Sequence, residues 1–159
     1  MKLIKGNIFD GKWDALFHCC NTKCTWGAGF APQLKKRFPA AFGADKKTEY
    51  MGEDKLSLYT FADCLANHGP VRIYNLYAQV GIGNDGNPLN RNLQYDYLFD
   101  SMFRMLHHYK ETCPSKSVRV VASPLVGGGL AGGNREIILT IMREVFKFYP
   151  QFEHHLYEL

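Results

Sequence analysis

The sequence predicts an α/β fold with a mostly parallel sheet, because the order strand, loop, helix recurs along the chain. Residues 15–20 and 117–123 are short apolar runs with little polar alternation, which suits strands buried on both faces. Each run leads into a glycine-rich stretch and then into an amphipathic helical pattern. Sheets of this class bind ligands at the carboxyl ends of their strands, so we expect the site where the two glycine stretches begin.

Further strands are expected at both ends and in the middle of the chain. Residues 2–5 and 154–159 are predicted as a first and a last strand. Residues 56–61 and 71–76 alternate more between polar and apolar side chains. The turn signal Asn67-His68-Gly69-Pro70 between them predicts that these two strands pair.

The first helix is expected near Pro32, since proline suits a first helical turn. The four-residue spacing of Phe30, Leu34 and Phe38 places them on one face. Pro39 is expected to end this helix.

Two longer helices follow. One is expected from about residue 92 to residue 109, with a buried stripe of Leu98, Met102 and Leu106. The other begins after Asn134, a favourable N-cap residue, and stops before Pro150. The side chains expected to face inward from this last helix are Ile137, Ile138, Ile141, Met142 and Val145.

Length and composition limit the number of domains, the kind of ligand and the cellular location that we expect. The 159 residues fit one domain, 1–159, and 46% hydrophobic with 21% charged residues is ordinary for a globular protein with a core. The formal net charge of +4 suits a polyphosphate ligand and is too small to argue for nucleic acid by itself. The cysteines number five, no signal-peptide core opens the chain, and no apolar run approaches roughly 18 residues. We therefore expect free thiols, a cytoplasmic location and no membrane contact.

Both glycine stretches are candidates for anion binding. The first is Trp26-Gly27-Ala28-Gly29-Phe30, and the second is Val126-Gly127-Gly128-Gly129-Leu130-Ala131-Gly132-Gly133. Backbone N–H groups at the start of a helix, with its positive dipole end, bind anions. Ordering the five glycines of the second stretch costs free energy, so a compensating phosphate contact is expected there, with a plain solvent loop as the alternative. For Gly27 and Gly29 the alternative is a plain tight turn. Together the two stretches predict a pocket for a nucleotide diphosphate.

Two common nucleotide-binding classes are disfavoured. The chain lacks Gly-x-x-x-x-Gly-Lys-Ser/Thr, so it is not a P-loop triphosphatase. Gly127, Gly129 and Gly132 fit Gly-x-Gly-x-x-Gly, but no later strand carries an acidic ribose ligand about 20 residues on, as a redox dinucleotide fold requires.

His18 and Asn21 lie where the first apolar run meets its glycine stretch. An asparagine amide can bond two ribose hydroxyls, and the alternative is a turn bond to its own backbone. A histidine there can transfer protons near neutral pH, and the alternative is a hydrogen-bonded core histidine.

Other histidines and cysteines are given no functional role. His18 lies close to Cys19, Cys20 and Cys24, but neighbouring strand residues point to opposite faces and no second ligand pair has finger-like spacing, so we expect no metal site. We also expect no cofactor. The histidine pairs at 107–108 and 154–155 are expected on the surface.

Five segments together resemble a known family. They are Lys5-Gly6-Asn7-Ile8, His18-Cys19-Cys20-Asn21, Trp26-Gly27-Ala28-Gly29-Phe30-Ala31, residues 124–133 and Leu156-Tyr157-Glu158-Leu159. In this order they resemble a macrodomain over nearly the whole chain. The likeness is greatest to the branch of ADP-ribose 1″-phosphate phosphatases and terminal ADP-ribose glycohydrolase-like proteins. It implies a three-layer α/β/α sandwich around a mixed, mostly parallel sheet, with ADP-ribose or ADP-ribose 1″-phosphate bound in a cleft.

The resemblance also implies roles for individual residues. Asn7 and Ile8 would lie at the adenine end, Asn21 would hold the distal ribose, and His18 matches a functional histidine of the phosphatase branch. The residues implied to flank the ribose and diphosphate are Gly27, Ala28, Gly29 and Phe30. Those implied to wrap the diphosphate from the other side are Val126, Gly127, Gly128, Gly129 and Leu130.

Differences from the family decide between activities. The glycohydrolases use a lysine and an aspartate where this chain has Gln79 and Ala131. The first hypothesis is therefore a phosphatase that removes the terminal phosphate of ADP-ribose 1″-phosphate, with His18 as general acid or base and Arg135 near the departing phosphate. The alternatives are a module that reads ADP-ribose or ADP-ribosylated macromolecules without turnover, and a hydrolase that removes ADP-ribose from them.

Overall fold

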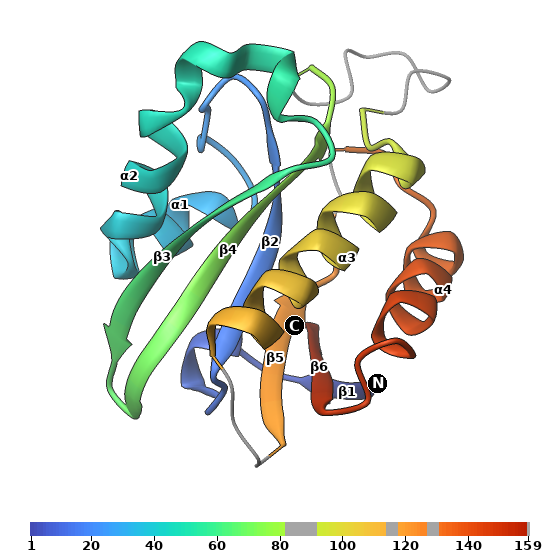
Figure 1. Cartoon of the computed structure of the whole chain (residues 1–159). Coiled ribbons are helices and arrows are strands. Elements are labelled where there is room, and N and C mark those ends of the chain that lie inside the picture. The colour runs from blue at the N-terminus through green and yellow to red at the C-terminus, as the bar shows by residue number, and fades with distance from the viewer. Residues whose placement is uncertain (82–91, 114–117, 127–130, 159) are drawn as a thin grey trace.

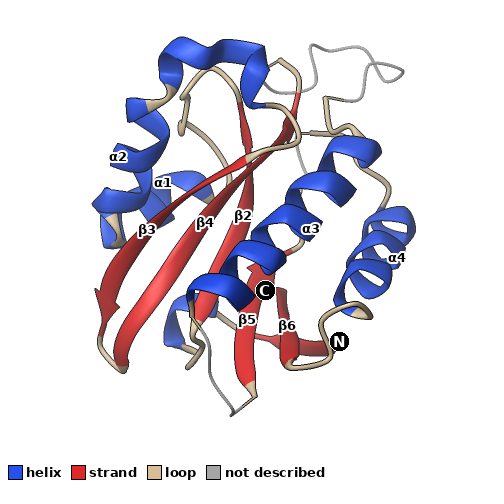
Figure 2. Cartoon of the chain, viewed as in Figure 1, coloured by secondary structure: helices blue, strands red, loops and turns tan. Residues whose placement is uncertain are grey.

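The computed structural model describes residues 1–81, 92–113, 118–126 and 131–158. The predicted α/β class is confirmed, since the described strands form one sheet in the order β1-β6-β5-β2-β4-β3 with helices on both faces (Figure 1). Figure 2 shows α1 and α2 over one face and α3 and α4 over the other, which makes three layers.

The sheet is mixed and mostly parallel, as predicted. Its neighbours pair in parallel except β3 and β4, which form an antiparallel hairpin closed at Asn67-His68. The described strands are β1 (Lys2–Lys5), β2 (Ala15–Asn21), β3 (Tyr59–Ala66), β4 (Gly69–Gln79), β5 (Arg119–Pro124) and β6 (Phe152–Glu158).

The helices cover two separate apolar cores. One core lies between the sheet and α3 and α4, and it contains the predicted stripe of Leu98, Met102 and Leu106. The other lies between the sheet and α1 and α2, and it contains Leu34 and Phe38. The described helices are α1 (Ala31–Arg37), α2 (Pro39–Lys47), α3 (Tyr95–Thr112) and α4 (Arg135–Phe146), with short 3₁₀ segments η1 (Ile8–Asp10) and η2 (Glu49–Lys55).

Helix α2 is absent from the sequence-based expectation. Pro39 ends α1, as predicted, but it also occupies the first turn of α2. A proline has no N–H to donate and its φ angle is already helical, so it can begin a helix as readily as it stops one.

Helix α4 begins as predicted and faces the core slightly differently. Asn134 Oδ1 accepts a 3.2 Å hydrogen bond from the Ile137 backbone N–H, which is the expected N-cap. Ile137 is 43% exposed, so the expectation that it faces inward is wrong. Leu139 is buried in its stead, because the inward face follows residues 138, 139, 142 and 145.

His154 is a buried residue, which corrects its expected surface position. Alternation along β6 turns Phe152, His154 and Leu156 to the covered face of the strand. The His154 ring stacks on Phe146 with centroids 4.4 Å apart, and its Nε2 lies 2.8 Å from Ser123 Oγ. Burial lowers the pKa of His154 to about 3.

The cysteines are all free thiols, as predicted. Within the described residues, no helix has the length and apolar character that a bilayer span requires.

Candidate ligand-binding site

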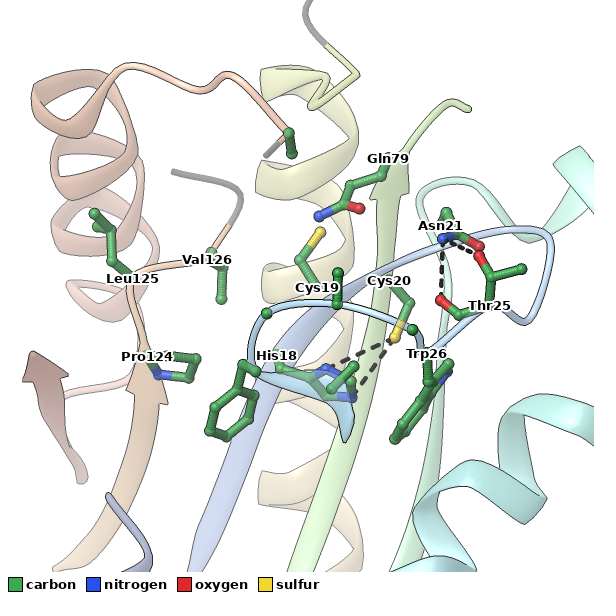
Figure 3. A pocket seen from close by; sticks show the side chains of 16 residues that line it. His18, Cys19, Cys20, Asn21, Thr25, Trp26, Gln79, Pro124, Leu125 and Val126 are labelled. Atoms are coloured by element: carbon green, nitrogen blue, oxygen red, sulfur yellow. Dashed lines mark hydrogen bonds between the residues drawn. The ribbon is translucent and has the colours of Figure 1, made fainter. Parts of the chain in front are cut away.

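A cavity of about 430 Å³ opens at the carboxyl ends of β2, β4 and β5, where the sequence places the site (Figure 3). Its floor and walls combine strand ends with the described parts of both glycine stretches. The lining residues are His18, Cys19, Cys20, Asn21, Thr25, Trp26, Gly27, Ala28, Gly29, Phe30, Ala31, Gln79, Pro124, Leu125, Val126 and Ala131.

The whole first glycine stretch borders this cavity. Gly29 has φ of +70°, a left-handed conformation that side chains with a Cβ rarely adopt. A Cβ added at Gly27 or at Gly29 would meet no atom within 4 Å outside the adjoining residues. Glycine at position 29 is therefore favoured by the backbone angle, and both positions leave the backbone open to a ligand.

The second glycine stretch meets the same cavity at both of its described flanks. Val126 before it and Ala131 after it are lining residues, together with Pro124 and Leu125 at the end of β5. Gly127, Gly128, Gly129 and Leu130, which the resemblance assigns to the diphosphate, lie outside the described residues.

One wall of the cavity is aromatic. The Trp26 indole meets the His18 ring edge-on with centroids 4.9 Å apart, and Phe30 lies 6.0 Å from His18. Behind Phe30, Phe9 stacks in parallel at 5.4 Å. These rings form a continuous apolar surface from the end of β2 to the segment that follows β1.

Asn21 borders the cavity, but its amide is already engaged. Its Nδ2 donates to Thr25 Oγ1 at 2.7 Å, and its Oδ1 accepts from the Lys23 backbone N–H at 2.9 Å. This is the local turn bond that the sequence left open as an alternative. A ribose contact by Asn21 stays a prediction.

Asn7 and Ile8 are not among the described residues that line the cavity. Asn7 Oδ1 caps η1 by accepting from the Phe9 N–H at 3.0 Å. Ile8 is buried, and its carbonyl accepts from Trp13 Nε1 at 2.9 Å. Their place at the adenine end stays a prediction.

His18 lines the cavity as a buried, hydrogen-bonded ring. Its Nε2 lies 2.6 Å from Asn75 Oδ1, and Cys20 Sγ lies 3.6 Å from Nε2 and 3.8 Å from Nδ1. Burial lowers its pKa to about 4, so the imidazole is neutral at pH 7. Among the described lining residues, none carries a carboxylate, a lysine or an arginine.

The thiols at the cavity are protonated at neutral pH. Burial raises the pKa of Cys19 to about 12 and raises the pKa of Cys20 well above its ordinary value. Since the thiolate is the nucleophilic form, these cysteines do not act as nucleophiles at pH 7.

A buried ion pair that the sequence did not predict supports the cavity from behind. Asp45 on α2 has no exposed surface and pairs with Lys55 of η2. Its carboxylate also accepts hydrogen bonds from Tyr77 and from Trp26 Nε1. Burial opposes ionisation of Asp45, but the hydrogen bonds from Lys55, Tyr77 and Trp26 leave its pKa below the ordinary value. No sequence signal marks this residue, because Lys46 and Lys47 beside it suggest a solvated face.

Arg135 does not line the cavity. Its guanidinium pairs with Glu158 at 2.8 Å and with Glu136 at 3.4 Å. A role at a departing phosphate stays a prediction.

Comparisons with known proteins show which fold this chain has. A protein of Enterobacteria phage T4, described as an uncharacterized 17.5 kDa protein in the tk-vs intergenic region, is 31% identical over 148 residues, 89% of this chain and 87% of its own length. The macrodomain of Mycobacterium tuberculosis DarG superposes with a TM-score of 0.81 at 21% identity, over 99% of this chain and 97% of that one. This chain has the macrodomain fold. No family model matches it.

Two further similarities concern ADP-ribose. Thermosipho africanus DarTG, solved in complex with ADP-ribose, shares the macrodomain fold with a TM-score of 0.76 at 17% identity, over 98% of this chain and 41% of that one. The ADP-ribose 1″-phosphate phosphatase of Meyerozyma guilliermondii is 42% identical over 45 residues, which are 26% of each protein.

Proposed function

We propose that this macrodomain binds ADP-ribose in the cavity at the carboxyl ends of β2, β4 and β5. One observation carries the proposal: the described parts of two glycine stretches, about a hundred residues apart in sequence, border a single cavity. Its volume of about 430 Å³ lies within the usual range for small-molecule sites. The ADP-ribose complex of Thermosipho africanus DarTG, which has the same fold, supports this choice of ligand.

The lining chemistry favours recognition by the backbone. Since no lysine or arginine is among the described lining residues, a diphosphate would be bound by backbone N–H groups of the glycine stretches. The rings of Trp26 and Phe30 offer an apolar wall against which the ribose can pack.

A second candidate function is removal of phosphate from ADP-ribose 1″-phosphate. It is favoured by the partial likeness to the Meyerozyma guilliermondii phosphatase and by an imidazole in the cavity wall. A neutral His18 could accept a proton from attacking water, whereas it holds no ionised form at pH 7 that would act as an acid. Phosphoryl transfer depends mainly on positioning, so the lack of a carboxylate among the described lining residues is tolerable.

Calorimetry with ADP-ribose, combined with a phosphate-release assay on ADP-ribose 1″-phosphate, tests both functions. Saturable binding at one site per chain supports the first proposal, and no heat at millimolar ligand would refute it. Phosphate release that His18→Ala abolishes supports the second. Release that survives in His18→Ala removes His18 from the reaction, and binding without release leaves a reader module.

A further inference from the structure

Behind the cavity wall, Asn75 lies at the centre of β4 with no exposed surface. Its Nδ2 donates to the Ala41 carbonyl at 2.9 Å and to Thr60 Oγ1 at 3.0 Å. Its Oδ1 lies 2.6 Å from His18 Nε2. One side chain thus joins His18 to helix α2 and to strand β3.

The orientation of the Asn75 amide is determined by its partners. A backbone carbonyl can only accept a hydrogen bond, so the NH₂ group of Asn75 must face Ala41. That leaves the amide oxygen facing His18, and an oxygen can only accept.

A second chain of hydrogen bonds requires the same orientation. The Asp45 carboxylate accepts from the Tyr77 hydroxyl at 2.7 Å. The Tyr77 oxygen is then free to accept from Thr60, whose Oγ1 lies 2.7 Å away. Thr60 has thereby used its proton and must accept from Asn75 Nδ2. The hydrogen bonds that start at Asp45 and the carbonyl of Ala41 therefore independently require the same orientation of the Asn75 NH₂ group.

We infer that Asn75 is a positioning residue of the cavity, which holds neutral His18 as the Nε2–H tautomer and leaves Nδ1 as the ring's one acceptor. The Nε2–H group donates to Asn75 Oδ1, so His18 has no N–H left to donate to a ligand phosphate. Within the described residues, the partner of Nδ1 is the weak donor Cys20 Sγ at 3.8 Å, so Nδ1 can accept from a ligand hydroxyl or from water. His18 thus selects hydrogen-bond donors, such as ribose hydroxyls, and this last step rests on the proposed function.

The tautomer is measurable without ligand. Long-range ¹H–¹⁵N correlation spectra of the full chain near pH 7 report each ring nitrogen as protonated or unprotonated. We expect His18 Nε2 to be of the protonated type and Nδ1 of the unprotonated type. Protonation at Nδ1 would overturn the inference. The result does not depend on ADP-ribose, so a correct tautomer without ADP-ribose binding would refute the proposed function alone.

Asn75→Leu tests the positioning role. Without the amide oxygen, His18 should populate both tautomers, and ADP-ribose affinity should fall about tenfold, the effect of one lost hydrogen bond. Asn92→Leu is the matched control, because Asn92 is also a buried asparagine and does not line the cavity. It should leave the His18 spectrum unchanged. An unchanged tautomer in folded Asn75→Leu would refute the positioning role. If that variant does not fold, the wild-type spectrum still shows whether His18 is the inferred Nε2–H tautomer.

Discussion

The Trp26 indole N–H donates a 2.8 Å hydrogen bond to Asp45 Oδ2, which fastens the start of the first glycine stretch to helix α2. The same carboxylate pairs with Lys55 and accepts from Tyr77. The cavity wall is therefore tied to an ion pair that has almost no exposed surface. This arrangement makes both stability and ligand affinity sensitive to a residue outside the cavity.

Asp45→Asn should destabilise the protein strongly. The substitution leaves the Lys55 ammonium buried without its counter-charge, which typically costs about 3–5 kcal/mol. Urea denaturation followed by circular dichroism measures this free energy of unfolding. Lys147→Met, which breaks the exposed pair with Glu144, is the control and should cost less than about 1 kcal/mol. Equal losses in the two variants would contradict the importance of burial.

Trp26→Phe should weaken ADP-ribose binding more than it weakens the fold. The variant keeps an aromatic ring beside His18 but removes the hydrogen bond to Asp45, so the first glycine stretch loses its anchor. Trp13→Phe removes the bond from another buried indole to the Ile8 carbonyl, away from the cavity. Calorimetry should show lower affinity for Trp26→Phe and wild-type affinity for Trp13→Phe. The reverse order would argue against an anchored loop.

Gly29→Ala should lower ADP-ribose affinity and cost about 1 kcal/mol of stability, because alanine is strained at a φ of +70°. Gly43→Ala is the matched change inside helix α2, where the same methyl group has open space. That variant should retain full affinity and gain a little stability from helix propensity. Thermal unfolding and calorimetry on both variants check the prediction, which fails if Gly29→Ala behaves like Gly43→Ala.

Stability should fall as the pH drops below about 6.5. Burial holds the pKa of His18 at about 4 and that of His154 at about 3, while both groups return to ordinary values near 6.5 in the unfolded chain. The unfolded state then binds more protons, so each histidine costs about 2 kcal/mol between pH 7 and pH 5. Urea denaturation across this range measures the loss.

The His154→Phe variant separates the two contributions. Phenylalanine can keep the stack on Phe146 but does not titrate, so the acid-induced loss of stability should shrink by about half. A slope unchanged by this substitution would mean that His154 is not the buried neutral group described above.

Most of the fold could be predicted because its signals are local. Residues 15–20 look like a buried strand in their own right, and Asn134 marks the start of α4 by its capping chemistry. The burial of His154 also had a signal, since Phe152, His154 and Leu156 share one face by strict alternation. Helix α2 was missed because Pro39 is compatible with both the end and the start of a helix.

The sequence predicted only the parts of the site that are formed by backbone, namely the glycine stretches and the strand ends. Glycine spacing located the cavity wall at residues 26–30, and the order of strands placed it at the carboxyl ends. The supporting side chains are different. Asp45 binds Lys55 and Tyr77 through tertiary contacts. Asn75 likewise binds His18 and Thr60 across neighbouring strands. A polar residue in a sequence reads as exposed unless its partner is known, and those partners lie on separate helices and strands.

Strand β1 pairs with β6, so that Lys2 lies opposite His155 and Lys5 opposite Glu158. On a ribosome, β1 is synthesised before β6 and must therefore wait for it before it can join the sheet. Pairing across such a sequence separation is slow and entropically costly. Completion of this sheet edge should be a late event in folding, after the central strands have already assembled.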